Sequence, residues 1–590
     1  MKLSDYVIDF ISRQGVRHIF EMTGEAIAHL IDSTIDAREV DTVSMHHEQA
    51  AAFAAEGYSR INGKLGVAMA TSGPGALNLL TGIGSCYFDS VPCLFITGQV
   101  NTYEFKFDRP VRQIGFQETD VVSIVKPITK YAKLVIDEKK IRYELEKAVF
   151  IAQNGRPGPV LLDLPLNVQR AQIEPDELES FFGSEEHRQY DDEAGADGIP
   201  ELEKVLDLLS QAKRPLILVG GGVRAGNAAS ELQELADRSS IPVVSSLLGL
   251  DALPTSHPLS IGLIGTYGNR YSNLAVANCD LLLVLGSRLD TRQTGTQPAT
   301  FARGARKIHV DIDSTELNAK VRADVAIHAD VKRFLKELNK RLPKAPKNKY
   351  AAWKRTIEDY MLRYPSGVKP TKRGIIDPNL FIQLLSACCE ENDLIVLDVG
   401  QHQMWASQSF QLKKGQRLLN AGGMGAMGFA VPAGIGAAIC RPGSRVVVIA
   451  GDGGFQVNIQ ELQTIVQHRL PLKIFIMNNH HLGIVRQFQD MYMDGRRQST
   501  VEGYECPDLV KVSKAYGIPA KRITRFEEAQ YIISEALETA GPRLVDIHLG
   551  METEVRPKLA VNRPIEDMYP FLERSELKSL MITKPLPEPQ

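Results

Sequence analysis

Short hydrophobic runs alternate with stretches of helical periodicity along most of this 590-residue chain. Residues 1–16 have the spacing of an amphipathic helix, and the nearly unbroken apolar runs at 65–71 and 91–100 predict buried strands. Strands that alternate with helices in this way are typical of a parallel sheet wrapped by helices. We therefore expect an α/β fold.

The same alternation recurs in two further blocks of the chain. The second block carries "RPLILVGGGV" and "CDLLLVLGSRLD", and the third carries "DLIVLDVG", "SRVVVIAGDGG" and "PLKIFIMNNH". A chain of this length exceeds what one hydrophobic core usually organises. We predict three doubly wound parallel-sheet domains and a closing tail, at residues 1–173, 199–342, 375–552 and 553–590.

The segments outside these blocks lack a clear period. Residues 174–198 are acidic and contain glycine, and residues 343–354 are rich in lysine and proline, so we expect both to be surface linkers. Prolines interrupt the tail repeatedly, and we expect it to add no core element.

Composition narrows the class of partner. Lys and Arg together number 68, and Asp and Glu together number 71, so the net charge is −3. This balance lacks the excess of positive charge that is typical of proteins that bind nucleic acid or a membrane surface. The seven cysteines include no CxxC pair, and no apolar run reaches membrane-spanning length. We expect a cytoplasmic protein that acts on small molecules and binds neither nucleic acid nor membrane.

The strongest candidate for chemistry is the segment 451–483. Asp452 follows a strand, Gly453 and Gly454 leave the backbone open to a phosphate, and the next stretch predicts a helix whose N-terminus would favour an anion. A second strand then ends at Asn479. A carboxylate, an amide oxygen and a backbone carbonyl suit Mg²⁺ shared with a diphosphate. The alternative is a tight turn beside an unrelated asparagine pair.

Two glutamates of the first block stand at the starts of predicted helices. Glu25 follows Gly24 where a strand turns into a helix, and Glu48 heads the alanine-rich stretch "EQAAAFAAEGYSR". An acidic residue in a first turn stabilises a helix through its dipole, which is the ordinary explanation for each. The other explanation is that one or both face a ligand.

The spacing of "GDGG" and "NN" in 451–483 resembles the diphosphate motif of thiamine diphosphate (ThDP) enzymes. The segments "TSGPGALNLLTGI", "NGRPGPVLLDLP", "LDVGQHQMWASQ" and "GGMGAMGFAVPAGIGAA" are similar to the acetolactate synthase branch, and the likeness covers nearly the whole chain. The resemblance implies ThDP- and Mg²⁺-dependent decarboxylation of a 2-oxo acid such as pyruvate. The acetyl unit would then pass to an acceptor ketone.

The resemblance also assigns site residues position by position. Glu48 would hydrogen-bond the aminopyrimidine of the cofactor and activate it, and Met427 would hold the cofactor bent. The remaining ThDP contacts would be Gln401, His402, Gly425, Gly453, Gly454, Asn479 and His481. Mg²⁺ would be held by Asp452, Asn479 and the carbonyl of His481, and the substrate side would be lined by Phe116 and Gln117. Taken singly, each residue also has an ordinary structural explanation.

The second block resembles the FAD-binding domain of the same family. The contacts that this implies are Gly221, Gly222, Gly265, Gly268, Arg288, Arg292 and Asp311. The alternative is a domain that is empty or that binds another nucleotide.

Four positions depart from the family pattern. Glu25 stands where the family has a glycine beside the thiazolium, Leu166 replaces a lysine, and Thr291 replaces an aspartate. Phe488 replaces a tryptophan that favours 2-oxobutyrate as acceptor in many members. We therefore place Glu25 and Phe488 in the predicted substrate pocket.

The loop at 101–115 is longer than the family pattern and is basic. It adds Lys106, Arg109 and Arg112 near the expected pocket mouth. These residues form either a solvated surface loop or a site for a phosphorylated acceptor, because guanidinium groups pair with phosphate.

Three functions remain open at this point. The first is an acetolactate-synthase-type carboligase, the second transfers the same acetyl unit to a larger ketone such as a nucleotide-linked keto-sugar, and the third is a non-catalytic relative. The resemblance also implies a homodimer or homotetramer with active sites at the subunit interface. It does not indicate a regulatory subunit.

Overall fold

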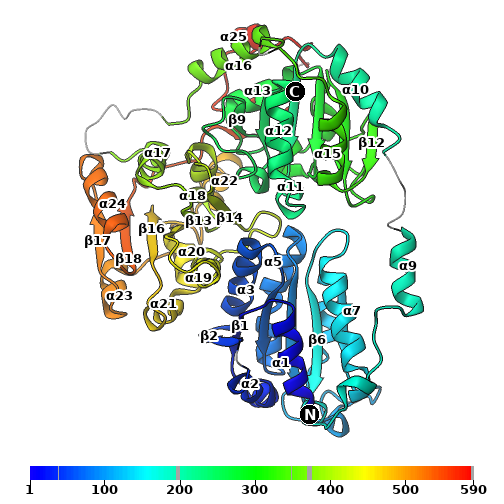
Figure 1. Cartoon of the computed structure of the whole chain (residues 1–590). Helices are drawn as coiled ribbons and strands as arrows, with labels where there is room; N and C mark the ends of the chain where they lie inside the picture. The colour runs from blue at the N-terminus through cyan, green and yellow to red at the C-terminus, as the bar shows by residue number, and fades with distance from the viewer. Residues whose placement is uncertain (38, 194–198, 347, 368–374, 587–590) are drawn as a thin grey trace.

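The computed structural model describes residues 1–590 apart from 38, 194–198, 347, 368–374 and 587–590. The described residues form three six-stranded sheets and one two-stranded sheet. All pairings within the large sheets are parallel, and helices flank each sheet (Figure 1). The predicted α/β class with three parallel sheets is confirmed.

The N-terminal sheet has the strand order β2-β1-β3-β4-β6-β5. Three of its four inner strands, β3, β4 and β6, are buried along their whole length, which accounts for their nearly continuous apolar sequence. The strands are β1 (His18–Met22), β2 (Asp41–Ser44), β3 (Gly66–Ala70), β4 (Cys93–Gln99), β5 (Tyr131–Leu134) and β6 (Val160–Pro165). The helices are α1 (Leu3–Arg13), α2 (Ala28–Ile35), α3 (Glu48–Asn62), α4 (Pro74–Asn78), α5 (Leu80–Asp89), α6 (Val121–Val125), α7 (Ile141–Gln153) and α8 (Leu166–Gln169).

The central sheet has the order β12-β11-β10-β7-β8-β9. Its strands are β7 (Pro215–Val219), β8 (Val243–Ser245), β9 (Ser260–Leu263), β10 (Leu281–Leu285), β11 (Arg306–Asp311) and β12 (Val325–His328). The helices of this part of the chain are α9 (Glu185–Glu193), α10 (Leu202–Gln211), α11 (Gly222–Ala225), α12 (Ala229–Ser239), α13 (Arg270–Asn278), α14 (Thr291–Thr294), α15 (Val331–Arg341) and α16 (Ala351–Arg363).

The third sheet has the order β14-β13-β15-β16-β18-β17, so the chain leaves β13 first to one side and then to the other. Ligands of open α/β sheets bind in the crevice at such a switch point. The strands are β13 (Leu394–Leu397), β14 (Arg417–Asn420), β15 (Val446–Gly451), β16 (Leu472–Asn478), β17 (Ala520–Ile523) and β18 (Arg543–His548). The helices are α17 (Pro378–Cys388), α18 (Gln401–Ser409), α19 (Ala430–Cys440), α20 (Asp452–Val457), α21 (Leu462–Gln467), α22 (Gly483–Tyr492), α23 (Leu509–Ala515) and α24 (Ala529–Glu538).

Helices α3 and α19 pack the N-terminal domain against the third domain. A Cβ atom on Gly57 would overlap the backbone of Ala433, and one on Gly436 would overlap the backbone of Ala54. The two helices therefore meet through glycine and alanine faces. In Figure 1 the N-terminal domain, in blue, lies below the green central domain and beside the third domain, in yellow and orange.

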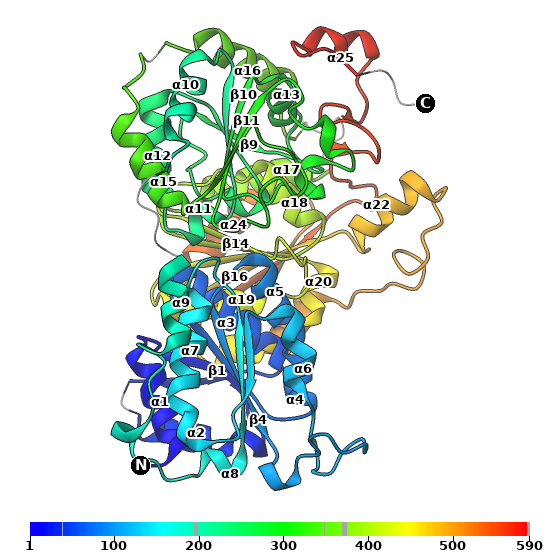
Figure 2. The same ribbon diagram turned by 90° about the vertical axis from the view of Figure 1, so that its right-hand side faces the viewer.

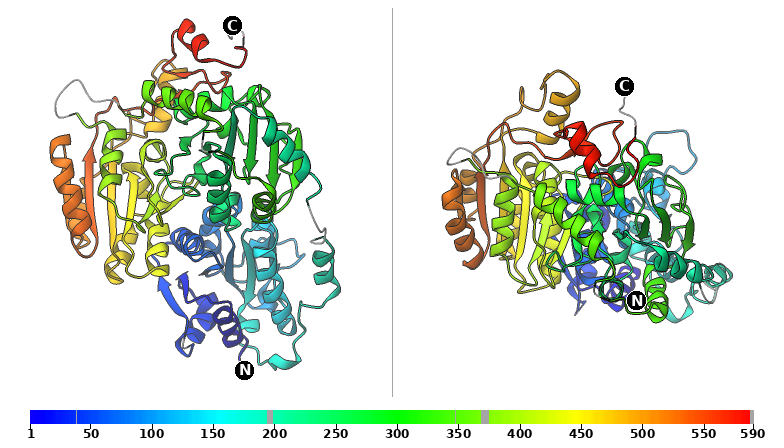
Figure 3. Two further views of the ribbon diagram at one scale, coloured as in Figure 1. Left: turned by 45° about the horizontal axis from the view of Figure 1, so that its top comes forward. Right: turned by 90° about the horizontal axis from the view of Figure 1, so that it is seen from above.

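The prediction that the tail adds no core element is wrong. Ile565 and Leu580 belong to the hydrophobic core of the central domain. The tail also forms an antiparallel pair, β19 (Lys558–Leu559) with β20 (Met568–Tyr569), and a last helix, α25 (Arg574–Leu580). Figure 3 shows the tail, in red, against the green central domain. The prolines keep the helices and strands of the tail short, but its apolar residues still pack against the core of the central domain.

Both segments predicted as linkers contain helices. Helix α9 lies within 174–198, of which 194–198 fall outside the described residues. Helix α16 begins at Ala351, and the buried Trp353 donates its indole N–H to the carbonyl oxygen of Pro215 at 3.1 Å. The linker prediction is therefore wrong from Ala351 onward, because this apolar face has a core to pack against. Among the described residues, no helix combines the length and apolar content needed to cross a membrane.

Candidate active site

The predicted ThDP and Mg²⁺ residues of the third domain follow four neighbouring strands. In the spatial order β14, β13, β15 and β16, the strands lead into residues 421–428, 398–402, 452–454 and 479–481. Because the strands are parallel, these segments emerge at one edge of the sheet, around the switch point beside β13. We refer to them together as the cradle.

Asp452 begins α20 directly after β15 and is almost completely buried. One of its carboxylate oxygens, Oδ2, accepts a hydrogen bond from the hydroxyl of Tyr504 at 2.7 Å. Burial raises the pKa of Asp452 to about 6, although Tyr504 and the backbone N–H of Asn479 partly offset this effect. The carboxylate and Asn479 are therefore brought together. Tyr504 was not expected from the sequence, because it lies in an irregular segment far from the motif.

His402 stands in the first turn of α18 and is 4% exposed. Its ring fits between two glycines: a Cβ on Gly400 would lie 2.6 Å from its Cε1, and one on Gly451 would lie 2.8 Å from its Nδ1. Burial lowers the pKa of His402 to about 3, so the imidazole is neutral at pH 7. Its Nε2 is buried and has no hydrogen-bond partner among the described residues. A buried polar atom of this kind fits a site that a polar ligand completes.

Gln401 and Asn479 form the floor of the cradle. The side-chain Nδ2 of Asn479 donates to Oε1 of Gln401 at 2.9 Å, which leaves the amide oxygen of Asn479 turned to other partners. That oxygen accepts a long hydrogen bond of 3.4 Å from the backbone N–H of His481. Gly483 closes the floor, since any side chain there would overlap Gln401.

The donor set of the cradle fits Mg²⁺. Asp452 offers one carboxylate, Asn479 an amide oxygen and His481 a backbone carbonyl. The described residues contain no group of three or more His, Cys, Asp or Glu side chains arranged around a metal position. A single carboxylate with neutral oxygens suits Mg²⁺, which takes further ligands from phosphate and water.

The upper wall of the cradle is formed by Met427, with Gly425 close by in the chain. Gly425 has a φ of 70°, a left-handed conformation that glycine adopts without strain. A Cβ on Gly453 would lie 3.5 Å from Cε of Met427, so the two residues face each other across the strand ends. A Cβ on Gly454 would lie 2.5 Å from Asp398. A Cβ on Gly453 would also lie 2.6 Å from Cδ2 of Leu482, so both glycines of the motif lie in close packing.

Asp398 connects two segments of the cradle, and it was not among the site residues predicted from the sequence. It is completely buried, and its carboxylate accepts three backbone N–H bonds, from Val399, Gly428 and Ala430, at 2.8 to 3.0 Å. Burial raises the pKa of Asp398 against the opposing effect of these donors. A carboxylate at the end of a buried strand, in "LDVG", was the signal that could have found it.

Glu48 begins α3 and is 7% exposed. It is not the cap of this helix, because the ring Nδ1 of His47 accepts the hydrogen bond from the N–H of Gln49 at 3.0 Å. The Oε2 of Glu48 accepts from Nδ2 of Asn78 at 2.9 Å, and its Oε1 lies against Gly75. Among the described residues, Oε1 has no hydrogen-bond donor.

Glu25 lies at the same edge of the N-terminal sheet as Glu48. It begins a 3₁₀ turn, Glu25–Ile27, that precedes α2, and its side chain is exposed. The backbone N–H of Ala26 donates to Oγ1 of Thr71 at 3.2 Å, and a Cβ on Gly75 would lie 2.8 Å from the methyl group of Thr71. Thr71 therefore links the turn of Glu25 to the surroundings of Glu48. Both glutamates follow strands, β1 and β2, whose carboxyl ends are adjacent.

The predicted substrate residues Phe116 and Gln117 follow the basic loop. Gln117 has a φ of 63° and packs against Gly73, whereas Phe116 is 84% exposed. The loop is tied at its base by buried Glu118, whose carboxylate accepts from the N–H groups of Lys106 and Ile114, each at 2.7 Å. The arginines at 109 and 112 are exposed. The loop is thus an anchored projection of the N-terminal domain.

In the described part of one chain, neighbouring residues connect the Glu48 region to the third domain, but the predicted residues of the two regions share no hydrogen bond or ion pair. Residues beside Glu48 contact the third domain: the N–H of His46 donates to Oε1 of Glu461 at 3.0 Å, and Nδ2 of Asn458 donates to Oε1 of Gln49 at 3.2 Å. Over the part of the chain that the structure describes, no hydrogen bond or ion pair joins Glu48 to Asp452 or to the rest of the cradle.

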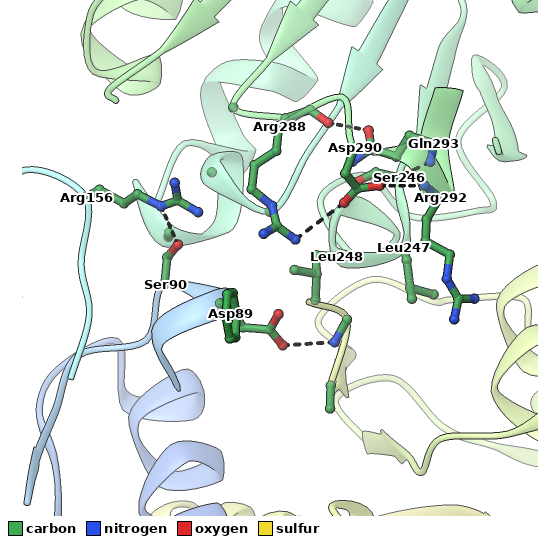
Figure 4. A pocket seen from close by; sticks show the side chains of 18 of the residues that line it. Asp89, Ser90, Arg156, Ser246, Leu247, Leu248, Arg288, Asp290, Arg292 and Gln293 are labelled. Carbon is green, nitrogen blue, oxygen red and sulfur yellow. Dashed lines mark hydrogen bonds and ion pairs between the residues drawn. The ribbon is translucent and has the colours of Figure 1, made fainter. Parts of the chain in front are cut away.

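A cavity of about 390 Å³ lies between the three domains (Figure 4). Its lining includes Asp311 and Asp330 of the central domain and Val399, Met424 and Gly425 of the third domain. Its volume suits a cofactor of moderate size. Val399, Met424 and Gly425 belong to both the cavity and the cradle.

Five of the seven residues predicted for FAD line this cavity. They are Gly221, Gly222, Arg288, Arg292 and Asp311. Gly265 and Gly268 are not part of the lining. They shape the adjoining turn, where a Cβ on Gly265 would overlap the backbone of Arg292. The cavity also contains Arg156, whose guanidinium bonds Ser90, Asp313 and Glu316 and which sequence reasoning did not identify.

Phe488 lies on α22 and not beside Glu25. Its ring packs 4.8 Å from that of Tyr492, and the ammonium group of Lys558 lies 5.8 Å from its centroid. The predicted substrate residues are therefore divided between the N-terminal domain and α22.

Models of thiamine pyrophosphate enzyme domains match three parts of the chain. The N-terminal TPP binding domain matches residues 1–124, the central domain 202–338, and the C-terminal TPP binding domain 398–547. The last range contains the whole cradle.

Full-length relatives are similar over almost the whole chain. Acetolactate synthase 1, chloroplastic, of Nicotiana tabacum is 37% identical over 590 residues, which cover 96% of this chain and 84% of that protein. Acetolactate synthase 1, chloroplastic, of Zea mays is 38% identical over 582 residues, covering 96% and 88%. Acetolactate synthase, chloroplastic, of Arabidopsis thaliana is 36% identical over 583 residues, covering 96% and 84%.

Proposed function

Because the chain belongs to the acetolactate synthase family of thiamine pyrophosphate enzymes, we propose that it decarboxylates pyruvate and joins the acetyl unit to a second 2-oxo acid. The observation that carries this proposal is the cradle, where a buried carboxylate, amide oxygen and unpartnered imidazole converge at a switch point. Buried polar atoms without partners are costly, so a non-catalytic relative would have no reason to retain them. The relatives favour this reaction over transfer to a keto-sugar.

Bound ThDP supplies the electron sink for loss of CO₂. Glu48 would hold the aminopyrimidine through Oε1, the oxygen that has no donor among the described residues. Asn78 fixes the direction of the carboxylate through the other oxygen. Glu48 is thereby positioned to accept a hydrogen bond from a cofactor nitrogen without reorganising.

The third domain would hold the diphosphate and its metal ion. Gln401 and His402 would bind phosphate oxygens, with His402 donating from Nε2 as a neutral imidazole, and Met427 would support the bend of the cofactor. Asp452, Asn479 and the carbonyl of His481 would hold Mg²⁺. Tyr504 orients Asp452 by donating to one oxygen and leaving the other for the metal.

The interdomain cavity is our proposed site for FAD. Its lining, which combines glycines of the central domain with Arg156 and Arg288, suits a ligand that carries phosphate. After purification and incubation with FAD, we expect visible flavin absorption that persists through gel filtration. A protein without flavin bands after this treatment would contradict the assignment.

A homodimer or higher oligomer would bring Glu48 of one copy to the cradle of another. Exposed apolar side chains surround both Glu48 and the cradle. Exposed apolar groups of this kind favour an interface, so we propose that both surfaces are covered in the assembly. Around Glu48 these side chains are Leu77, Tyr87, Phe88 and Ile124, and around the cradle Met424, Met427, Val457 and Val485. In Figure 2 helices α4, α5 and α6 lie along the same side of the molecule as α20 and α22.

We propose a cytoplasmic location for this protein. The relatives named above are chloroplastic proteins, so this proposal rests on the cysteines and not on the comparisons. All seven cysteines are free, as expected in a reducing compartment.

The direct test is to incubate the purified protein with ThDP, Mg²⁺ and pyruvate and to measure CO₂ and acetolactate. We expect both products in equal amounts, and none after Mg²⁺ is removed with a chelator and ThDP is omitted. Failure to release CO₂ from pyruvate under these conditions would overturn the proposed function.

A further inference from the structure

A second cavity, of about 400 Å³, also has walls from all three domains. The N-terminal domain contributes the end of α3 and the segment after α5, the central domain contributes α11, and the third domain contributes the start of β14. The second cavity shares Asp89 and Leu248 with the cavity proposed for FAD (Figure 4). Of the seven residues predicted for FAD, only Gly221 lines the second cavity.

Positive charge exceeds negative charge in the wall of the second cavity. The charged residues of this wall are Arg60, Lys64, Arg224, Arg417, Asp89 and Asp251. Arg60 is balanced, because it forms ion pairs with Asp89 at 2.6 Å and with the buried Glu56 at 2.5 Å. The unbalanced charge therefore lies with Arg224 and Arg417, which share Asp251.

Asp251 is a single carboxylate between two guanidinium groups. Its side chain is 4% exposed, Oδ1 lies 3.1 Å from Nε of Arg224, and Oδ2 accepts a hydrogen bond from Nε of Arg417 at 2.8 Å. The backbone N–H of Leu418 donates to the same Oδ2 at 3.2 Å. Because one negative charge faces two positive charges, this group of three side chains keeps a net positive charge.

The charges of these three groups affect one another. Burial favours the neutral form of Asp251, but the charges of Arg417 and Arg224 outweigh this effect and lower the pKa of its carboxyl group. Burial lowers the pKa of Arg224, the charge of Asp251 opposes this shift, and the charge of Arg417 adds to it. The two guanidinium groups therefore repel each other. A second anion between them would reduce this repulsion, and the gain is larger in a partly buried cavity than in water.

Both arginines still have unused hydrogen-bond donors. Nη2 of Arg224 donates to the backbone carbonyl of Asp251, and Nη1 of Arg417 donates to the backbone carbonyl of Arg60 at 2.9 Å. Nη1 of Arg224 and Nη2 of Arg417 form no hydrogen bond in the described part of the chain. The two side chains are 28% and 21% exposed, so each is fixed by Asp251 and still open to a ligand. Guanidinium groups fixed in this way match the geometry of a phosphate group.

The rest of the wall offers apolar contacts. It includes Val91 and Pro92 of the N-terminal domain and Leu418 of the third domain. Cavities of this size, with mostly apolar walls and a few polar groups, are typical of sites for small organic molecules. Gly63 and Lys64 line the cavity and are exposed, so a ligand can enter from solvent.

We propose that the second cavity binds a small organic phosphate, with the phosphate group held by Arg224 and Arg417 and the carbon part placed against Val91, Pro92 and Leu418. The bound molecule contacts all three domains and stabilises their arrangement. This site is separate from the residues proposed for ThDP, Mg²⁺ and FAD, so it goes beyond the proposed function.

The test uses phenyl phosphate as the probe and protein that is saturated with ThDP, Mg²⁺ and FAD, so that the other phosphate sites are occupied. By calorimetry we expect saturable binding that is about tenfold or more tighter than the binding of inorganic phosphate, because the ring contacts the apolar wall. Benzyl alcohol, which has the ring without the charge, should not bind detectably. Phenyl phosphate should also raise the temperature of thermal unfolding.

Arg224→Met removes one of the two cations and leaves Asp251 paired with Arg417. We expect it to weaken the binding of phenyl phosphate about tenfold or more, since charge-assisted hydrogen bonds are lost, and Arg224→Lys should retain part of the affinity. Arg306→Met is the matched control. It removes the same charge from an exposed side chain of the central domain that pairs with Asp324 and lines neither cavity, so binding should be unchanged.

Gly63 allows a second pair of variants that does not disturb Asp251. Gly63 has a φ of 69°, and a Cβ there would meet no atom within 4 Å. Asparagine and aspartate both tolerate this backbone conformation, so Gly63→Asn and Gly63→Asp differ in charge and not in fold. Gly63→Asp should weaken the binding of phenyl phosphate about threefold or more by repulsion, and Gly63→Asn should change it by less than about twofold.

Three results would overturn the site: no binding of phenyl phosphate to the saturated protein, wild-type affinity in a folded Arg224→Met, or displacement of FAD by the probe. Equal affinity for inorganic phosphate would overturn the assignment to an organic phosphate. If Arg224→Met does not fold, equal affinities of Gly63→Asp and Gly63→Asn would count against the site, and a loss confined to Gly63→Asp would support it.

Discussion

Glu48 is not a helix cap, since His47 caps α3, and Asn78 occupies only one of its carboxylate oxygens. Replacement by glutamine keeps the shape and an acceptor toward Asn78 but removes the charge. We expect Glu48→Gln to bind ThDP within a few-fold of the wild type and to lose about 100-fold or more in turnover. Calorimetry and the acetolactate rate measure the two effects, and wild-type turnover would contradict the assigned role.

Glu25 is exposed at the edge of the sheet that carries Glu48, and we expect its charge to oppose a second negative substrate. We expect Glu25→Gly to raise acetolactate formation by about two- to tenfold, because like-charge repulsion of the acceptor is removed. Glu25→Gln separates charge from size, and it should raise the rate as well if charge is the cause. Unchanged rates in both variants would show that Glu25 does not face the acceptor.

At the residue scale, the sequence predicts the groups whose partners lie close in the chain or in a known motif. Asp452 and Asn479 were found in this way, and the structure brings them together. Tyr504 and Arg224 were not found, since their surroundings are created by segments that meet only after folding. A tyrosine in a polar segment and an arginine after a run of glycines carry no local signal of their partners.

At the scale of elements, the glycines of α19 set how closely it can approach α3. We expect Gly436→Ala to lower stability strongly, by several kcal/mol, because the new methyl group would overlap the backbone of Ala54, which cannot rotate away. Gly434→Ala in the same helix is the control. Its Cβ would meet side chains and no backbone, Val448 at 3.0 Å, Leu472 at 3.4 Å and Val446 at 3.5 Å, so a small shift accommodates it. Thermal unfolding measures both, and equal transition temperatures would contradict this account of the packing.

Buried strands were the most predictable elements. Strands β7, β10, β13 and β15 coincide with unbroken apolar runs, because a strand covered on both faces needs no polar residue. The helix predicted after the glycines, at "NIQELQTIV", forms as a 3₁₀ turn, Ile459–Glu461, followed by α21. The separate helix α20 was not predicted: it begins at Asp452 itself and ends before Asn458, whose side chain donates to the carbonyl oxygen of Gly428 at 2.8 Å. A tertiary contact overrides local helix preference there.

At the scale of the whole molecule, the arrangement of the domains decides which residues can share a cofactor. Within one chain, α3 and α19 pack closely and the residues beside Glu48 contact the third domain, yet no hydrogen bond or ion pair joins Glu48 to Asp452 among the described residues. Sequence patterns predict the Glu48 region and the cradle separately, because each lies at the strand ends of its own sheet. These patterns contain no information on how the Glu48 region of one copy packs against the cradle of another.

This arrangement predicts that two inactive variants complement each other. If each active site combines Glu48 of one copy with Asp452 of another, a mixed dimer of Glu48→Gln and Asp452→Asn contains one site with both native residues and one site with neither. Random assembly after co-expression would then give about one quarter of the wild-type activity, because half of the dimers are mixed and each has one working site. Each variant alone should be nearly inactive. If the site forms within a single chain, every chain carries a defect and co-expression restores nothing, so the acetolactate rate of the mixture distinguishes the two assemblies.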